Sequence, residues 1–206
     1  MRKIPALFAL SLFAATAPAQ SLRFISTAYP NIYCHFSSGC SVTPVEQYGA
    51  YTPTNVPVTC TLESRSFPGS TQNATGQYGY EYQLTLNNGG ATDSNTVSVS
   101  SLTLEFCAPE SFAFGEHASN FVWVVTSGGP VGLAPSDASL SDKEVTFQFD
   151  PPLTLATQTD QATNTFYFGM ISGGAPEITQ ATLEGTTEDP VNGKLPFKGK
   201  LPAQTP

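Results

Sequence analysis

The stretch YGYEYQLTLNNGG, from Tyr78 to Gly90, decides the fold that the sequence predicts. Its even-numbered positions are aromatic or aliphatic as far as Leu86, whereas its odd-numbered positions, including Glu81, are small or polar. A period of two is typical of a β-strand that buries one face. The Asn-Asn-Gly-Gly run that follows tolerates positive φ, so we expect the strand to end in a turn there.

The three tyrosines of this stretch share their face with Leu84 and Leu86. Aromatic side chains that bind a ligand must face solvent, whereas continuity of phase directs these rings toward the interior. We therefore predict that Tyr78, Tyr80 and Tyr82 belong to the core, with their hydroxyl groups reaching its rim for hydrogen bonds.

A change of phase occurs in the next predicted strand, Asn95 to Cys107. Its apolar residues are odd-numbered as far as Val99 and even-numbered from Leu102 onward. A strict period of two cannot keep both sets on one face. The sequence therefore predicts a β-bulge or bend near Ser100 and Ser101.

Strand-like runs separated by Gly-, Pro- and Asn-rich joints continue along the chain, and no helical periodicity of useful length interrupts them. This pattern predicts an all-β protein, an antiparallel β-sandwich of immunoglobulin-like or jelly-roll-like type with extended terminal arms. The core is assigned to residues 56–190. It lies between an irregular N-terminal arm over residues 20–55, with a small disulfide loop, and a C-terminal arm over residues 191–206. Further strands are predicted at Val56–Phe67, Phe121–Ser127, Val145–Asp150, Thr165–Ser172, Ile178–Gly185 and Lys194–Leu201.

The first nineteen residues resemble a secretory signal peptide. Arg2 and Lys3 precede an apolar run, which ends in the small-residue sequence Ala17-Pro18-Ala19. The run is shorter than the ~20 residues that span a bilayer. We expect a mature chain that begins at Gln20, is secreted, periplasmic or on the cell surface, and has no membrane span after cleavage.

Charge excludes one class of partner. Without Arg2 and Lys3, six basic residues remain against sixteen acidic ones. A nucleic-acid interface needs clustered Lys and Arg, so we expect no nucleic-acid partner. The three lysines near the C-terminus, Lys194, Lys198 and Lys200, are interpreted as part of a solvated terminal segment.

Four cysteines follow the signal peptide, and in an oxidising compartment an even number indicates two disulfides. Three connectivities are possible. We favour Cys34 with Cys40, across a short loop, and Cys60 with Cys107, because the latter two lie in strand-like runs.

The sequence contains none of the familiar catalytic or nucleotide-binding motifs, among them G-x-S-x-G, H-E-x-x-H, the P-loop and the dinucleotide fingerprint. Its two histidines, His35 and His117, are interpreted as surface or loop-packing residues. Asn73-Ala74-Thr75 matches the N-glycosylation sequon and suggests an exposed loop. We therefore expect no enzymatic activity.

Paired carboxylates would be needed for the hydrolase alternative. A glycoside hydrolase uses an acid and a base or nucleophile about 5 to 10 Å apart. The acidic residues that could supply such a pair are Glu81, Glu105, Glu110 and Glu116.

A carbohydrate-binding module is the other alternative, and two features favour it. Tyr48 and Tyr51 lie in an irregular segment where aromatic rings could be exposed. The acidic loop with Asp137, Asp142 and Glu144 could hold calcium through oxygen ligands, although its spacing does not fit an EF-hand. No other cofactor is expected.

The segments YEYQLTLNNGG, NTVSVSSLTLEFC and NTFYFGMISGGAP resemble secreted bacterial β-sandwich modules, including those of PEP-CTERM-sorted surface proteins. The similarity covers about half of the mature chain. The sorting tail of that family is missing, because this chain ends in GKLPAQTP. The resemblance implies an extracellular binding or structural role and carries no catalytic residue.

Together, these features favour a non-enzymatic structural or interaction protein of the cell exterior. A self-assembling filament, sheath or matrix subunit would fit, since terminal arms such as Gln20–Ile32 or Lys194–Leu201 could add a strand to a neighbour's sheet. The same arms could instead pair within their own sheet. A cell-surface or glycan partner is the alternative to self-association.

Overall fold

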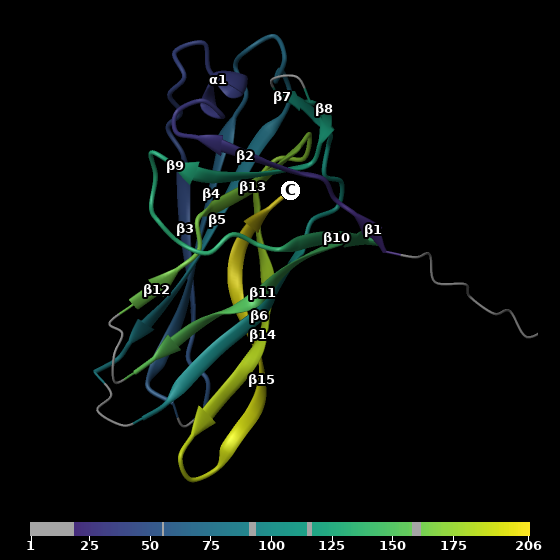
Figure 1. Cartoon of the computed structure of the whole chain (residues 1–206). Coiled ribbons are helices and arrows are strands. Elements are labelled where there is room, and N and C mark those ends of the chain that lie inside the picture. Colours follow the sequence, from purple (N-terminus) through teal and green to yellow (C-terminus); the bar gives the residue numbers. More distant parts are fainter. Residues whose placement is uncertain (1–18, 55, 91–93, 115–116, 158–161) are drawn as a thin grey trace, which may run out of the picture.

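The computed structural model describes residues 19–54, 56–90, 94–114, 117–157 and 162–206. Apart from Ala19, the predicted signal peptide lies outside these residues. Strands dominate, and the one α-helix of the described chain, α1, is the single turn Tyr33–Phe36. No helix in the described ranges is long and apolar enough to cross a membrane. The predicted all-β, antiparallel sandwich is confirmed (Figure 1).

Two large sheets form the sandwich, and a short β7–β8 hairpin, Phe112–Phe114 with His117–Asn120, lies apart from them. All pairs are antiparallel except β2 with β9. The six-stranded sheet has the order β1 (Gln20–Ser21), β10 (Asp137–Ser141), β11 (Glu144–Ala156), β6 (Thr96–Glu105), β14 (Glu177–Asp189) and β15 (Gly193–Thr205). The seven-stranded sheet has the order β2 (Phe24–Ala28), β9 (Val122–Ser127), β13 (Tyr167–Ser172), β5 (Tyr78–Asn88), β4 (Val58–Pro68) and β3 (Val45–Tyr51), with β12 (Ala162–Asn164) also on β5.

Strand β5 places its even-numbered side chains between the two sheets, as its alternation predicts. Tyr80 and Tyr82 are fully buried, and Tyr78 packs against the same core from a partly buried position. The hydroxyl group of Tyr80 donates to Gly174 O at 2.7 Å, and that of Tyr82 donates to Gln204 O at 2.8 Å. The tyrosines are therefore core residues whose polar ends find backbone acceptors.

The predicted bulge lies in β6 at Ser100. Ser101 pairs with Gln148 of β11, and the next paired residue on the other side is Val99, so Ser100 is left out of the ladder. The register to β14 shifts at the same place. The extra residue returns both Val99 and Leu102 to the core side, where each is fully buried.

The segment 20–55 is more regular than expected, since it holds β1, β2, α1 and β3. Strand β3 is at the edge of its sheet and β2 pairs on one side only, so neither needs the strict alternation that reveals a half-buried central strand. The C-terminal arm is also a strand, because β15 pairs with β14 along its whole length.

One of the two predicted disulfides forms. Cys34 and Cys40 are bonded, whereas Cys60 and Cys107 are free thiols, so the second predicted bridge is wrong. Cys60 lies near the start of β4, which pairs with the last residues of β5. Cys107 follows the C-terminal end of β6. At about 3.3 Å per residue, β6 is about 30 Å long, so the two cysteines lie toward opposite ends of the sandwich and out of disulfide reach.

A thiol titration tests this assignment. We expect the native chain to present one rapidly reacting thiol, that of the exposed Cys107, and the denatured chain to present two. Cys60 is fully buried, and burial raises the pKa of its thiol to about 12, which suppresses the reactive thiolate. A denatured, unreduced chain without any free thiol would contradict the assignment.

Candidate binding face

The outer face of the seven-stranded sheet is covered at one end by the segment that contains α1 (Figure 1). Ile32 and Phe36 of this segment are fully buried and join a second apolar cluster, outside the main core, with Phe67 of β4 and Trp123 of β9. The rings of Phe36 and Phe67 meet edge-to-face, with centroids 4.9 Å apart. The sheet is therefore buried on both faces at this end.

A row of residues crosses the same sheet from β9 to β3. Ladder pairing sets Trp123 beside Gly169, Gly169 beside Glu81, Glu81 beside Arg65, and Arg65 beside Glu46. Neighbours in such a row lie within side-chain reach of one another on one face. The fold thus brings one indole, one guanidinium and two carboxyl groups together from four strands.

Gly169 makes the first part of this row possible. A Cβ atom at this position would lie 2.4 Å from the Trp123 ring and 2.3 Å from the Tyr80 carbonyl oxygen. The missing side chain lets the indole lie across β13, where its Nε1 donates to Glu81 Oε1 at 3.1 Å.

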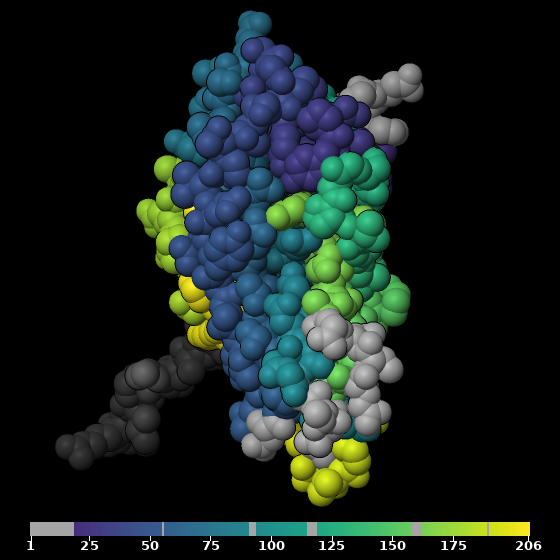
Figure 2. All heavy atoms as spheres, turned by 90° about the vertical axis from the view of Figure 1, so that its left-hand side faces the viewer, coloured from purple at the N-terminus to yellow at the C-terminus, as the bar shows by residue number. Residues whose placement is uncertain are grey.

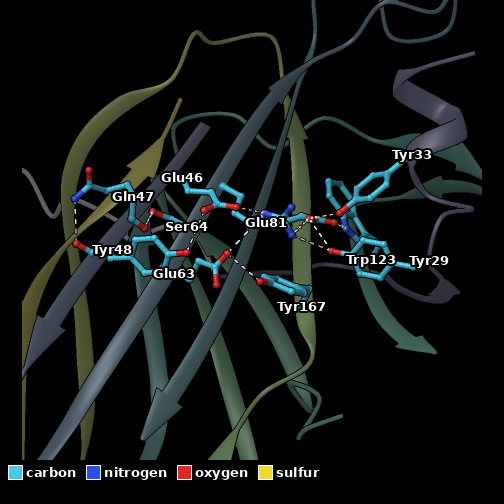
Figure 3. A network of polar contacts seen from close by, with 11 residues as sticks. Tyr29, Tyr33, Glu46, Gln47, Tyr48, Glu63, Ser64, Glu81, Trp123 and Tyr167 are labelled. Atoms are coloured by element: carbon cyan, nitrogen blue, oxygen red, sulfur yellow. Dashed lines mark hydrogen bonds and ion pairs between the residues drawn. The ribbon is translucent and has the colours of Figure 1, made fainter. Parts of the chain in front are cut away.

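Glu81 is fully buried beneath the α1 segment and has several polar partners (Figure 3). Tyr33 donates to Glu81 Oε2 at 2.9 Å, Tyr29 approaches the same oxygen at 3.4 Å, and Arg65 Nη1 lies 3.7 Å from it. Burial raises the pKa of Glu81, and Arg65 together with the hydrogen-bond donors opposes that rise. The buried carboxyl group is thus satisfied on both oxygens.

Arg65 joins the buried end of the row to its open end. Its Nη1 donates to the Tyr29 hydroxyl oxygen at 3.1 Å, and its guanidinium lies 4.9 Å from the centroid of the Tyr167 ring. Its Nε lies 3.7 Å from both Glu46 Oε1 and Glu63 Oε1. Burial lowers the pKa of Arg65, but the Tyr33, Tyr29, Glu81 and Tyr167 side chains together outweigh burial and raise it, so the guanidinium stays charged.

The open end of the row forms a surface that we call the Arg65 face, made of Glu46, Tyr48, Glu63, Arg65 and Tyr167. Tyr48 donates to Glu46 Oε2 at 3.1 Å, and Tyr167 donates to Glu63 Oε1 at 2.9 Å. Figure 2 shows the surface hollowed where the purple N-terminal segment, the blue β3–β4 segment and the green segment around β9 meet. The face therefore offers aromatic rings and fixed carboxylates around one guanidinium.

The two aromatic residues expected to bind ligand lie on opposite faces of β3. Tyr48 is 55% exposed and belongs to the Arg65 face. Tyr51 is partly buried on the inner side and stacks on Phe197, with centroids 5.9 Å apart. The three-residue spacing in a strand sends the side chains to opposite sides, so they form no shared platform.

The carboxylates proposed for a hydrolase do not converge. Glu81 is inaccessible, Glu105 is exposed at the end of β6, and Glu110 accepts from Gln77 and Gly173 in another part of the fold. Glu116 lies outside the described residues.

The proposed calcium ligands are also separated. Asp137 pairs with Gln148, and Glu144 begins β11 four ladder steps away, with Asp142 in the intervening turn. Within the ranges that the structure describes, no three His, Cys, Asp or Glu residues are placed to hold a metal ion.

Sequence reasoning placed Glu81 on the polar face of β5 but missed its partners. Arg65 lies on the same side of the neighbouring strand, which the alternation of β4 could have indicated. Tyr29, Tyr33 and Trp123 come from distant segments, and no sequence spacing links them to Glu81. Of the two histidines, His35 lies on α1, and nothing is described for the side chain of His117.

Comparison with known proteins adds no residue roles to this geometry. The resemblance to secreted bacterial β-sandwich modules stays a prediction. The chain matches no family model, no curated protein sequence and no solved structure.

Proposed function

We propose that this chain is a secreted, non-enzymatic binding protein of the cell exterior that recognises neutral glycans with the Arg65 face. The proposal that the chain is secreted rests on its N-terminal sequence, which resembles a signal peptide. The ligand class comes from the chemistry of Glu46, Tyr48, Glu63, Arg65 and Tyr167.

One observation carries the proposal: the Nε–H of Arg65 is shielded from solvent and has no hydrogen-bond partner in the described structure. It lies 3.7 Å from two carboxylates, a distance too long for direct hydrogen bonds. A hydroxyl group between them would accept from Arg65 Nε and donate to Glu46 or Glu63. Glu46 is 43% exposed and can move to admit it. Sugar hydroxyls combine both hydrogen-bonding roles, whereas purely anionic or cationic groups do not.

The charges around the site favour a neutral glycan. Glu46 and Glu63 both lie against the single guanidinium, and Glu81 lies behind it. The whole chain is also acidic, with a formal charge of −8. An acidic polysaccharide would meet like charges here, which opposes association. The exposed ring of Tyr48 supplies an apolar surface on which a sugar ring can pack.

The structural-subunit and hydrolase alternatives receive less support. Both arms proposed for strand addition already pair within the chain. In the N-terminal arm, β1 pairs with β10 and β2 pairs with β9. In the C-terminal arm, β15 pairs with β14. Pro196 and Pro202 lie in β15 at the end of its sheet order, a feature that discourages pairing with another chain. The carboxylates predicted for a hydrolase do not converge, because Glu81 is buried, Glu105 lies at the end of β6, and Glu110 accepts from Gln77 elsewhere in the fold.

Binding of oligosaccharides to designed variants tests the proposal. A glycan array followed by calorimetry is expected to show neutral oligosaccharides bound by the wild-type chain. Tyr48→Ala and Glu63→Gln should each weaken binding about tenfold, the effect of losing a ring contact or a charge-assisted hydrogen bond. Lys198→Gln, at an exposed position of β15 in the other sheet, is the matched control and should bind like wild type.

Two results would contradict the proposal. One is the absence of binding to any neutral glycan by a folded chain. The other is equal affinity in wild type, Tyr48→Ala and Glu63→Gln, which would place any glycan site elsewhere.

A further inference from the structure

The α1 segment, residues 29–42, covers the buried network through side chains of its one helical turn. Tyr33 donates to Glu81, and Phe36 packs against Trp123, with ring centroids 5.8 Å apart. The turn has only four residues, and a helix so short is not stable through its own hydrogen bonds. Its place on the sheet therefore depends on how the segment around it is held.

The second half of this segment is tied to α1 by the Cys34–Cys40 disulfide. The backbone hydrogen bonds of residues 37–41 stay within the segment in the described part of the chain. Ser37 N donates to Tyr33 O at 2.8 Å, and Cys40 N donates to Ser37 O at 2.9 Å. The disulfide is therefore the covalent link that fixes this loop to the helical turn.

Cys40 has an uncommon backbone conformation. Its φ of 52° lies in the left-handed region, which is unfavourable for a residue with a Cβ atom. Such conformations persist where the surrounding structure enforces them, and they are frequent in switch regions. Here the bridge to Cys34 helps to enforce it. Breaking the bridge would allow Cys40 to leave this conformation and would loosen the loop.

The position of the bridge favours a local role rather than stabilisation of the whole domain. Its two cysteines are six residues apart, and closing so short a loop removes little entropy from the unfolded chain. Cys34 is exposed, so a thiolate can reach its sulfur. Exposed disulfides are the ones that are labile and regulatory. We therefore expect reduction to change the conformation of the α1 segment and to be reversible.

We propose that the Cys34–Cys40 disulfide is a redox-sensitive latch: a dithiol that reduces it loosens the α1 segment and admits water to Glu81 and Trp123, while the sandwich stays folded. One thiolate of the dithiol attacks a bridge sulfur, which breaks the S–S bond and forms a mixed disulfide. The second thiolate then displaces the protein sulfur. The reductant leaves as a disulfide, and its two protons pass to Cys34 and Cys40. The latch is independent of any ligand at the Arg65 face.

Fluorescence of Trp123, the one tryptophan of the chain, tests the latch in the folded protein. The oxidised chain from Gln20 onward would be treated with dithiothreitol at neutral pH, and mass spectrometry after alkylation would establish the gain of two thiols. The indole is fully buried in the oxidised chain. On reduction we expect emission at longer wavelength and about threefold more efficient quenching by acrylamide, because local opening exposes the ring. Reoxidation should reverse both changes.

Three variants separate the covalent link from the backbone conformation. Cys34→Ser combined with Cys40→Ser should behave like the reduced wild type, with or without dithiothreitol. Cys34→Ser combined with Cys40→Gly should lie closer to the oxidised chain, because glycine readily adopts the φ of Cys40. Cys107→Ser leaves the bridge intact and is the matched control, which should respond to reduction like the wild type.

Three results would overturn the proposal. The first is a fully reduced chain with unchanged emission and quenching of Trp123. The second is a bridge that millimolar dithiothreitol does not reduce in the native chain. The third is loss of the β-sheet circular dichroism signal on reduction, which would make the bridge a determinant of the whole fold. Should the double serine variant fail to fold, reduction of the native wild type decides, because that experiment starts from the folded chain.

Discussion

Replacing Glu81 with alanine is expected to destabilise the protein by about 3–5 kcal/mol, the usual cost of removing one partner from a buried ion pair. The variant leaves Trp123 Nε1 and the Tyr33 hydroxyl without their acceptor and Arg65 without its buried counter-charge. In a domain of this size the loss corresponds to a fall in melting temperature of about 10 °C. Thermal unfolding followed by the fluorescence of Trp123, the one tryptophan of the chain, measures it.

Glu81→Gln is the matched control for this experiment. The amide keeps the volume, its oxygen can accept from Trp123, and its nitrogen can donate to a tyrosine hydroxyl oxygen. We therefore expect a loss well below that of Glu81→Ala. Equal stability of wild type and Glu81→Ala would show that the network contributes nothing to folding.

Wild type and Glu81→Gln also test the direction in which the pKa of Glu81 is shifted. Burial raises its folded-state pKa, so at low pH, with the carboxyl protonated in both states, burial carries no ionisation penalty. As the pH rises above the usual glutamate value, the unfolded state loses its proton first and wild-type stability falls. Wild type should therefore lose stability relative to Glu81→Gln as the pH rises above about 4.5, the usual glutamate value. The opposite slope would show that Arg65 outweighs burial.

Gly169→Ala is the second substitution with a large expected effect, a loss of about 3 kcal/mol. The added Cβ would overlap both the Trp123 ring and the Tyr80 carbonyl oxygen, so the indole must leave its place across β13. That movement breaks the hydrogen bond from Trp123 to Glu81. We expect both a lower unfolding midpoint and a changed emission maximum of Trp123.

Gly39→Ala is a suitable comparison, because a Cβ there would meet nothing closer than 3.9 Å. Its unfolding midpoint and emission should match wild type. An unchanged Gly169→Ala protein would mean that the indole does not cross β13.

Much of the main core could be predicted because it depends on local alternation. The phase of Tyr80 and Tyr82 and the shift between Val99 and Leu102 were enough to place β5, and to locate the bulge at Ser100. These features depend on the alternation of side chains along one strand and its neighbours. They can therefore be predicted from the order of apolar and polar residues in the sequence.

The outer cluster could not be predicted in the same way. The helix α1 has four residues, too few to show a helical period, and its burial depends on strands that pair elsewhere in the chain. Glu81 was assigned correctly to the side of β5 opposite Tyr80, but its burial depends on the α1 segment, which covers that side of the sheet. The Cys60–Cys107 prediction was wrong for a related reason, since strand character does not reveal at which end of the sandwich a residue lies.

The most direct test of the glycan-binding account is to map the binding surface by NMR. Amide resonances of the isotope-labelled chain from Gln20 onward would be followed while cellohexaose, maltohexaose and mannohexaose are added in turn. The account predicts that at least one of these shifts resonances around Glu46–Tyr48, Glu63–Arg65 and Tyr167, and leaves the outer face of β6 and β14 unchanged. Shifts confined to another surface, or none with any of the three, would contradict it.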